Sequence, residues 1–367
     1  MTDSQIRNLL LHMQIDADPA ASPEAIFARL SRLLEAPAPA NSCALPGAVG
    51  DVIMALADEL GLGCAPVAST GNLAIEIGDP GAPLDLLVTA HMDRPCFRVR
   101  RPADGTLYPL CAIRVPGDGY VCEAAALRYI DGRVRVAAVG NMRFEAVGGS
   151  YHIRFQAESG ELRAGDTVMM RAAPQLRDGL AVGAGLDNAI GVLLALLTAR
   201  ALQQYAAEVI ADRRILFAFT DQEEGPPIGL FGQGAARLAH SIEQPRLGFI
   251  NIDGHNVDEG AGHVLGVGAS QAFVSGDGRG SVVPLDYQAM AESLAAQVNE
   301  TGPGTVRLNY SYVSRSDDML LSAWARCLGL TGVIVANAHT TEETAALDDV
   351  VAAAHWIPSL IQELLEG

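Results

Sequence analysis

The chain has 367 residues, of which 49% are hydrophobic, enough for one large domain with an insertion or for two domains. Its 43 acidic and 25 basic residues give a formal net charge of −18, and no basic patch is segregated, which argues against nucleic-acid binding. No uncharged run reaches the roughly 18 residues that a membrane-spanning helix needs. The acidic balance instead favours cations, either metal ions or amine-bearing substrates, as ligands.

The first 95 residues alternate between helical and extended patterns. Ser22 and Pro23 are followed by apolar residues at helical spacing, which predicts a helix over residues 22–36. A second helix is predicted over residues 46–63, where glycines mark its end. Residues 72–93, NLAIEIGDPGAPLDLLVTAHMD, then have the pattern of a strand, a turn and a second strand.

Residues 96–174 have a different sequence pattern from the segments on either side. Short β-like runs such as AIRV, RVRVAAV and YHIRFQA are separated by glycine and aspartate turns, and no long helical pattern occurs. Because this block interrupts an otherwise alternating chain, we predict a small all-β domain inserted into a larger one.

After Leu180 the alternation of helices and strands resumes. Apolar strands that alternate with helices predict an α/β sheet covered on both faces. Helices are predicted over residues 186–210, 232–242, 284–300, 316–329 and 346–367, and strands over residues 213–220, 245–253, 306–312 and 331–338.

The cysteines and the first residues indicate the compartment. The N-terminal sequence MTDSQIRNLLLHMQID lacks the basic leader and the long apolar stretch of a signal peptide. The cysteines are scattered and form no CxxC pair, which is typical of buried thiols and not of a disulfide framework. We therefore expect a cytoplasmic protein. The six cysteines are at positions 43, 64, 96, 111, 122 and 327.

Metal-competent side chains follow four of the predicted strands, and one more lies at the start of a buried helix. In an open α/β sheet, ligands bind outside the carboxyl ends of the strands, so these side chains are predicted to meet at one edge. Each alone also fits a structural role, as a loop histidine, a solvated acidic pair or a helix cap, but their joint occurrence favours a metal site. The set comprises His91, Asp93, Asp187, Glu223, Glu224, Asp253 and His339.

The residue types in this set predict hydrolytic chemistry. Carboxylates buried together are costly unless cations neutralise them, and imidazole with carboxylate suits zinc, or else cobalt or manganese. Asp187 is the best-placed residue to bridge two metals, because it lies on a short turn. The side chains of Glu223 and Glu224 point apart, so one can bind metal while the other acts as general base. Two metals would activate a water molecule and polarise a carbonyl group, which predicts cleavage of an amide bond.

Asp93 has a predicted supporting role. Residues i and i+2 of a strand point the same way, which places Asp93 beside His91. We expect its carboxylate to hold the imidazole ring and to select the tautomer.

The motifs TAHMD, GLDNAIG, TDQEEG, NID and AHTTEE occur in this order and resemble those of the dinuclear metallo-aminopeptidases of family M42. That family belongs to the clan that also holds the M20 and M28 peptidases. The resemblance covers nearly the whole chain, from STGNLAIEIG near its start through GDTVMMR in the insertion. The spacing of 96 positions from His91 to Asp187 (187 − 91) matches the β-rich insertion that M42 proteins place between these two ligands.

The resemblance implies an architecture. It implies a central mixed sheet between helices, formed by residues 1–95 and 175–367, as the catalytic domain. Residues 96–174 would form the inserted dimerisation or lid domain. The family assembles into large homo-oligomers, often tetrahedral dodecamers, so self-assembly is expected here.

The resemblance also implies a role for each site residue. Two divalent ions would bind per chain, with Asp187 bridging them. His91 and Asp253 would hold one ion, and Glu224 and His339 the other. Glu223 would be the general base, and Asp93 would orient His91. The implied activity is removal of N-terminal amino acids from peptides.

This chain departs from the M42 pattern beside the ligands. Arg94-Pro95 stands where typical members have an acid and an apolar residue, and Asn188 where they have an arginine. After Glu223-Glu224 typical members continue with Val-Gly, whereas this chain continues with GPP, which includes Pro226-Pro227. These changes leave open a related N-acyl amino acid deacylase or carboxypeptidase, and a non-catalytic binding protein. A carboxypeptidase needs an arginine for the substrate's terminal carboxylate, and Arg94 is the one arginine in the ligand segments. Glu342 and Glu343 are candidates for binding a substrate amine.

Overall fold

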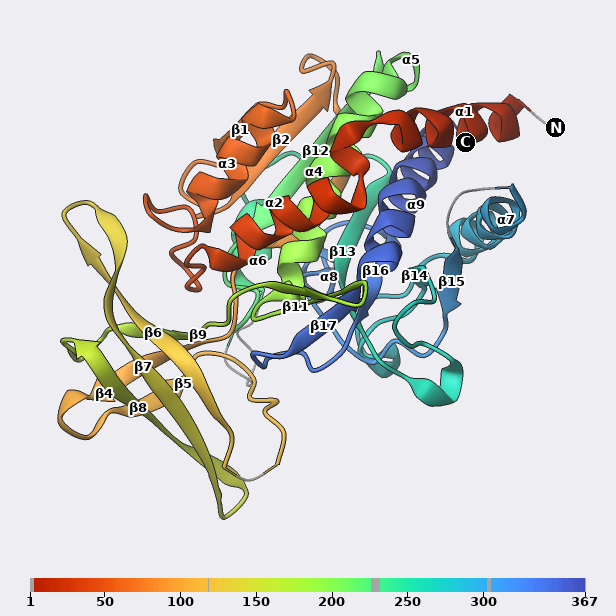
Figure 1. Ribbon diagram of the computed structural model, residues 1–367. Coiled ribbons are helices and arrows are strands. Elements are labelled where there is room, and N and C mark those ends of the chain that lie inside the picture. Colours follow the sequence, from red (N-terminus) through yellow and green to blue (C-terminus); the bar gives the residue numbers. More distant parts are fainter. Residues whose placement is uncertain (1–2, 118, 226–231, 302–304, 367) are drawn as a thin grey trace.

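The fold is known from a computed structural model, which describes residues 3–117, 119–225, 232–301 and 305–366. A mixed eight-stranded sheet forms the body of the described chain (Figure 1). Its four central strands, β12, β3, β13 and β16, run parallel, with β2 antiparallel on one side and β14 antiparallel on the other. In spatial order the strands are β1 (Cys64–Pro66), β2 (Leu73–Gly78), β12 (Arg214–Thr220), β3 (Leu84–His91), β13 (Gly248–Asn256), β16 (Cys327–Val335), β14 (Ala269–Ala272) and β15 (Val306–Asn309).

Burial explains the continuous apolar runs of the central strands. Every residue of β3 and of β16 is buried, whereas β2, nearer the edge, alternates between buried and exposed positions. A strand that is covered on both faces must be apolar on both faces, so its sequence loses the period of two.

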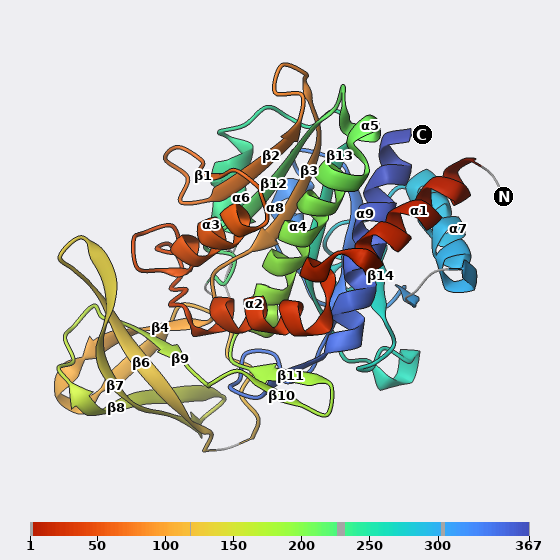
Figure 2. The ribbon, with the colours of Figure 1, turned by 45° about the horizontal axis from the view of Figure 1, so that its top comes forward.

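Helices cover both faces of the sheet (Figures 1 and 2). Helices α4 (Leu186–Tyr205) and α9 (Leu347–Glu366) pack against each other and against the central strands, with α2 (Pro23–Glu35) over α4. Helices α6 and α8 lie on the opposite face. The remaining helices are α1 (Asp3–Ala17), α3 (Val49–Glu59), α5 (Ala207–Ile210), α6 (Gln233–Ala239), α7 (Leu285–Thr301) and α8 (Asp318–Leu321), with short 3-10 turns η1 (Pro19–Ala21), η2 (Pro102–Asp104), η3 (Glu259–Ala261) and η4 (Gly276–Gly278).

Helix α4 is the core helix of the body. It is the one helix of the described chain that is long and apolar enough to cross a membrane, but 78% of its most apolar window is buried inside the protein. Its apolar character on all sides follows from packing against β3 and β13 beneath it and against α2 and α9 beside it.

The inserted segment forms a separate closed barrel at the side of the body (Figure 1). Phe97, Phe144 and Phe155 are fully buried inside it, so the barrel has its own apolar core. Together, body and barrel confirm the predicted fold class, a mixed sheet between helices with a small all-β insertion. The barrel order is β4 (Cys96–Arg101), β5 (Thr106–Pro109), β8 (Ser150–Gly160), β7 (Arg133–Val147), β6 (Val121–Ile130) and β9 (Thr167–Met170).

A small three-stranded sheet follows the barrel where the chain re-enters the body. Its strands are β10 (Gln175–Arg177), β11 (Leu180–Gly183) and β17 (Glu343–Ala346). Strand β11 leads directly into α4, and its partner β17 leads into α9. The loops before α4 and before β17 are therefore held side by side.

The helix predicted over residues 316–329 is wrong. Only Asp318–Leu321 is helical, and β16 already begins at Cys327. The segment's apolar residues fit either a helix or a buried strand, and burial between β13 and β14 selects the strand. The helix predicted over residues 186–210 is also divided, because it ends at Tyr205 and α5 follows as a separate turn.

Helix α1, which the sequence analysis did not identify, docks through a histidine pair. His12 Nε2 lies 2.7 Å from Ser359 Oγ, and His355 Nε2 lies 3.2 Å from Asp16 Oδ1. The two rings are perpendicular, with their centroids 5.4 Å apart. Burial lowers the pKa of His12 to about 4, helped by the neighbouring His355, and burial lowers that of His355 to about 4 as well.

We predict that acidification loosens α1. Both folded-state pKa values lie below the ordinary value, so the unfolded state binds more protons as the pH falls from about 6.5 to about 4, and stability is lost over that range. Thermal unfolding and hydrogen exchange of α1 across this range measure the effect. His12→Leu should flatten the pH dependence, whereas His152→Leu, at an exposed barrel position, should not. An unchanged pH profile in His12→Leu would contradict the explanation.

Candidate metal centre

Four adjacent parallel strands deliver the predicted site residues to one edge of the sheet. His91 is the last residue of β3, the two glutamates follow β12, Asp253 lies in β13, and His339 follows β16. Asp187 joins them from the first turn of α4. All of these except Asp93 line one solvent-open cleft, namely His91, Asp187, Glu223, Glu224, Asp253 and His339.

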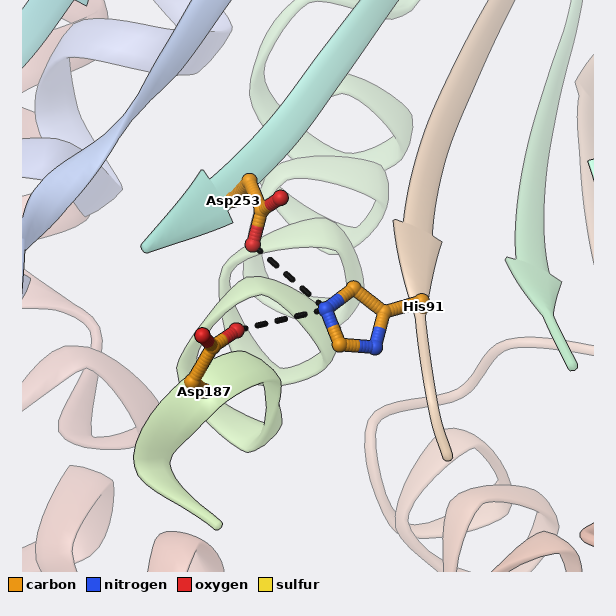
Figure 3. A group of neighbouring side chains, drawn as sticks. All are labelled: His91, Asp187 and Asp253. Atoms are coloured by element: carbon orange, nitrogen blue, oxygen red, sulfur yellow. Dashed lines mark hydrogen bonds and ion pairs between the residues drawn. The ribbon is translucent and has the colours of Figure 1, made fainter. Parts of the chain in front are cut away.

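The first group of ligand-type atoms centres on His91 (Figure 3). Its Nε2 atom lies 3.3 Å from Asp187 Oδ1 and 3.5 Å from Asp253 Oδ1. The three atoms lie within 4.8 Å of one another, a spacing that one cation can span.

The second group centres on His339. Its Nε2 atom lies 2.9 Å from Glu224 Oε1 and 3.9 Å from Asp187 Oδ2. Asp187 thus belongs to both groups, with one carboxylate oxygen toward each. This is the arrangement expected of a carboxylate that bridges two cations.

Backbone carbonyl groups fix the tautomer of both histidines. His91 Nδ1 donates to the carbonyl oxygen of Asp93 (3.1 Å), and His339 Nδ1 donates to that of Ala112 (2.9 Å). A carbonyl oxygen only accepts, so the hydrogen must lie on Nδ1. Each Nε2 therefore faces the neighbouring carboxylates of the cleft, and a metal ion bound there would take the place of its proton.

Asp93 differs from its expected role in the atom that holds the ring. Its carboxylate oxygen lies 3.8 Å from His91 Nδ1, and its backbone carbonyl makes the hydrogen bond instead. The carboxylate accepts from the backbone N–H groups of Glu223 (2.9 Å) and Glu224 (3.1 Å). Asp93 therefore orients the turn that carries both glutamates.

Glu343 is a site residue whose structural role the sequence did not reveal. It is fully buried, and it accepts from the backbone N–H groups of Gly185 (2.9 Å), Asp187 (3.0 Å) and His339 (2.8 Å). It thereby ties the bridging aspartate to the histidine of the second group. The expectation that Glu342 or Glu343 binds a substrate amine is not supported, because neither residue lines the cleft. Glu342 instead forms an ion pair with Arg177, with 3.5 Å between Glu342 Oε2 and Arg177 Nη1.

Asp317 is a second unrecognised neighbour of the site. Its side chain makes no capping bond at the start of α8 and instead accepts from Thr220, the last residue of β12. Burial is the main reason why its pKa is raised to about 6. Asp317 is thus one more carboxylate held out of water next to Glu223.

The buried carboxylates of the cleft would be stabilised by added positive charge. Burial, followed by the charge of Asp187, raises the pKa of Asp253. Burial also holds the pKa of Glu223 well above its usual range, with a further contribution from Glu224, although the charge of His91 opposes this. Burial also raises the pKa of Asp187, but His91 and His339 outweigh it and bring the value to about 2. Divalent cations would relieve the repulsion among these carboxylates.

Arg94 does not face the cleft. It is buried and donates to the carbonyl oxygens of Leu33 (2.6 Å), Leu34 (2.8 Å) and Ala36 (2.7 Å) at the end of α2. A Cβ atom at Gly185 would lie 2.0 Å from Arg94 Cδ, so the glycine is required for this packing. Arg94 therefore caps a helix and is not placed to bind a substrate carboxylate.

The other departures from the M42 pattern have different outcomes. Asn188 donates to the carbonyl oxygen of Ile252 (2.8 Å) and accepts from Gly191 N–H (2.9 Å), which joins the start of α4 to β13 beside Asp253. The Pro226-Pro227 pair lies outside the described residues.

The inserted barrel takes part in the site. Besides the bond from His339 to Ala112, the Tyr120 hydroxyl lies 2.8 Å from Thr341 Oγ1 and accepts from Thr341 N–H (2.9 Å). The barrel segment 110–120 is thus fastened to the loop that carries His339. It also places Arg114 on the cleft wall, and Arg315 lines the cleft from the body. The sequence analysis overlooked both arginines.

Solved structures share the fold over nearly the whole chain. The TET1 peptidase of Pyrococcus horikoshii, which can assemble into a tetrahedron or a large octahedral shell, is 18% identical over 91% of this chain and 98% of that chain (TM-score 0.68). An aminopeptidase from the archaeon Desulfurococcus kamchatkensis is 16% identical over 93% and 95% (TM-score 0.69). An endoglucanase from Thermotoga maritima is 17% identical over 92% and 98% (TM-score 0.62). At these identities the likeness shows the fold.

Comparison by sequence assigns the family. No curated protein matches the sequence. The family model of peptidase family M20/M25/M40 matches residues 164–363, which is more than half of the chain. The matched part holds five of the six site residues that line the cleft, and the likeness to a peptidase clan expected from the motifs is confirmed. The chain belongs to peptidase family M20/M25/M40.

Proposed function

We propose that this protein is a dinuclear metal-dependent aminopeptidase. The observation that carries the proposal is the pair of ligand groups that share Asp187, at the edge of a sheet in a peptidase-family fold. The insertion between His91 and Asp187 supports the M42 type within the clan, and the similar TET1 peptidase and archaeal aminopeptidase are matched over 98% and 95% of their chains.

The proposed ligands follow from the two groups. His91 and Asp253 would hold one divalent cation, Glu224 and His339 the other, and Asp187 would bind both. Imidazole and carboxylate donors fit zinc, and also cobalt or manganese. When bound, the two cations would supply Lewis acidity for the amide carbonyl and for water.

Glu223 is the proposed general base. It lines the cleft but belongs to neither ligand group, with its Oε2 atom 3.9 Å from His91 Nε2. The Asp93 carboxylate accepts a hydrogen bond from the backbone N–H of Glu223, which fixes the turn that carries the Glu223 side chain. From this position Glu223 would take a proton from the attacking water and return it to the leaving amine.

A second candidate is an N-acyl amino acid deacylase or a carboxypeptidase. It is favoured by Arg114 and Arg315 on the cleft wall, since those reactions require a cation for the substrate's carboxylate. Aminoacyl p-nitroanilides, dipeptides, N-acetylated amino acids and a cellulose control, assayed with zinc, cobalt or manganese, separate the candidates. Hydrolysis of N-acetylated amino acids alone would overturn the aminopeptidase assignment.

We further propose a cytoplasmic homo-oligomer. All six cysteines are unpaired thiols, as in a reducing compartment. The barrel exposes apolar side chains at Tyr108, Tyr129 and Val136, which a partner subunit would cover. Light scattering should give a mass that is a multiple of the chain, up to a dodecamer. A monomer at all concentrations would contradict self-assembly.

The general base gives a direct test. Glu223→Gln keeps the shape of the side chain but removes the proton acceptor, so we expect kcat to fall by about 10²- to 10⁴-fold while the metal content is unchanged. Metal analysis and steady-state kinetics measure both quantities, and Glu342→Gln, in an exposed side chain, is the matched control. Near-normal turnover by Glu223→Gln would show that another group is the base.

Glu343 should govern metal affinity without touching metal. Glu343→Ala leaves three buried N–H groups of the ligand loops without an acceptor, so we expect metal affinity to fall by about 10- to 100-fold, as for other residues that orient metal ligands. Calorimetric titration of the metal-free protein with zinc measures the change. Glu343→Gln, which keeps an acceptor, should lose less, and Glu342→Ala should lose nothing. Equal affinity in all variants would contradict this role.

A further inference from the structure

One barrel residue, Tyr120, reaches the loop that carries His339. Its hydroxyl accepts a hydrogen bond from the backbone N–H of Thr341 (2.9 Å) and lies 2.8 Å from Thr341 Oγ1. Tyr120 and Thr341 are 221 positions apart in the sequence, and Thr341 follows His339 by two positions. Because the hydroxyl contacts the backbone of Thr341 as well as its side chain, it fixes the loop itself.

The loop depends on such contacts because its backbone has an uncommon conformation. Asn337 has a φ of 57° and His339 a φ of 65°, in the left-handed region that residues other than glycine rarely adopt. A residue stays in that region only where the surrounding structure holds it there. From the body, Glu343 accepts a hydrogen bond from His339 N–H (2.8 Å). The barrel adds the contacts of Ala112 and Tyr120.

The barrel fixes its own side of these contacts. The backbone carbonyl oxygen of Tyr120 accepts from Phe144 N–H in β7 (2.8 Å), and the two rings pack with their centroids 5.8 Å apart. Phe144 is fully buried in the barrel core. Next to Ala112, Leu110 N–H donates to the carbonyl oxygen of Cys96 in β4 (2.9 Å). The hydroxyl of Tyr120 and the carbonyl oxygen of Ala112 are therefore placed by the fold of the barrel.

The first ligand group is held by the body instead. His91 Nδ1 donates to the carbonyl oxygen of Asp93 (3.1 Å), which is two positions further along the chain. Asp253 lies within β13, which pairs with β3 and β16. Within the part of the chain that the structure describes, hydrogen bonds from barrel segment 110–120 reach the loop of His339 and neither His91 nor Asp253.

We infer that Tyr120 is a positioning residue for His339, and that the barrel thereby controls the second ligand group but not the first. This inference rests on the proposed binding of two cations. Tyr120 lies outside the wall of the cleft, so it acts through Thr341 on the backbone of the loop. Release of that loop would let His339 turn away from Glu224, whose Oε1 atom lies 2.9 Å from His339 Nε2.

Calorimetric titration of the metal-free protein with zinc tests this selectivity. Tyr120→Phe removes the hydroxyl but keeps the ring that packs on Phe144, so we expect the affinity of one zinc site to fall by about 10- to 100-fold while the other is unchanged. His339→Ala identifies the affected site, because Tyr120→Phe should not weaken the zinc that this variant still binds. Tyr151→Phe is the matched control, since its ring also packs on Phe144 (centroids 6.4 Å apart) but lies in β8.

Hydrogen exchange tests the positioning of the loop without any metal. In Tyr120→Phe the N–H group of Thr341 loses its acceptor, so exchange in residues 337–343 of the metal-free protein should become faster. Exchange in barrel strands β6 and β7 should stay as in the wild-type protein. Faster exchange throughout the barrel would show that the hydroxyl only stabilises its own domain, and would overturn the inference.

The outcomes separate this inference from the proposed function. If the wild-type protein binds two zinc ions and Tyr120→Phe weakens both equally or neither, the inference is wrong and the dinuclear centre stands. If the wild-type protein binds fewer than two zinc ions, the proposed function fails, and hydrogen exchange still decides the role of Tyr120. Unchanged exchange in residues 337–343 of Tyr120→Phe would then overturn the inference.

Discussion

The structure of the cleft depends on the cost of removing several carboxylates from water together. Asp187, Glu223, Glu224 and Asp253 line one cleft, with Asp93 and Asp317 buried behind it. Two imidazoles offset only part of this negative charge. Such a group of carboxylates is stable only if hydrogen bonds or cations compensate their charge. Backbone N–H groups donate hydrogen bonds to the Asp93 carboxylate. Asp187 belongs to both ligand groups, an arrangement that fits a pair of cations.

The supporting residues explain how loops hold such a site. Glu343 connects the loop before α4 to the loop after β16, and Asp93 fixes the turn after β12. Arg94 caps α2 and packs against Gly185, so the position of the bridging aspartate is linked to the helical layer. The hydrogen bonds among these contacts use backbone groups, so they do not occupy the candidate metal-binding atoms.

The inserted barrel is an integral part of the site. Its segment 110–120 gives His339 a hydrogen-bond acceptor, binds Thr341 through Tyr120 and places Arg114 on the cleft wall. An insertion that only mediated assembly would not need these contacts. The barrel therefore connects the geometry of the second ligand group to the wall of the cleft.

The sequence by itself determined the fold class and the set of ligand-type residues, because buried parallel strands are continuously apolar and their ends open at a common edge. It also identified the inserted β segment from its turns. It did not determine that residues 327–335 form a strand, since an apolar run fits helix and strand equally until its neighbours in the sheet are known. The contacts of Glu343 and Arg94, and the position of Arg114 on the cleft wall, were decided only by the tertiary structure. Each depends on contacts with segments that are distant in the sequence. The residues next to a charged side chain in the sequence do not indicate which backbone group it will bind or which cleft it will line.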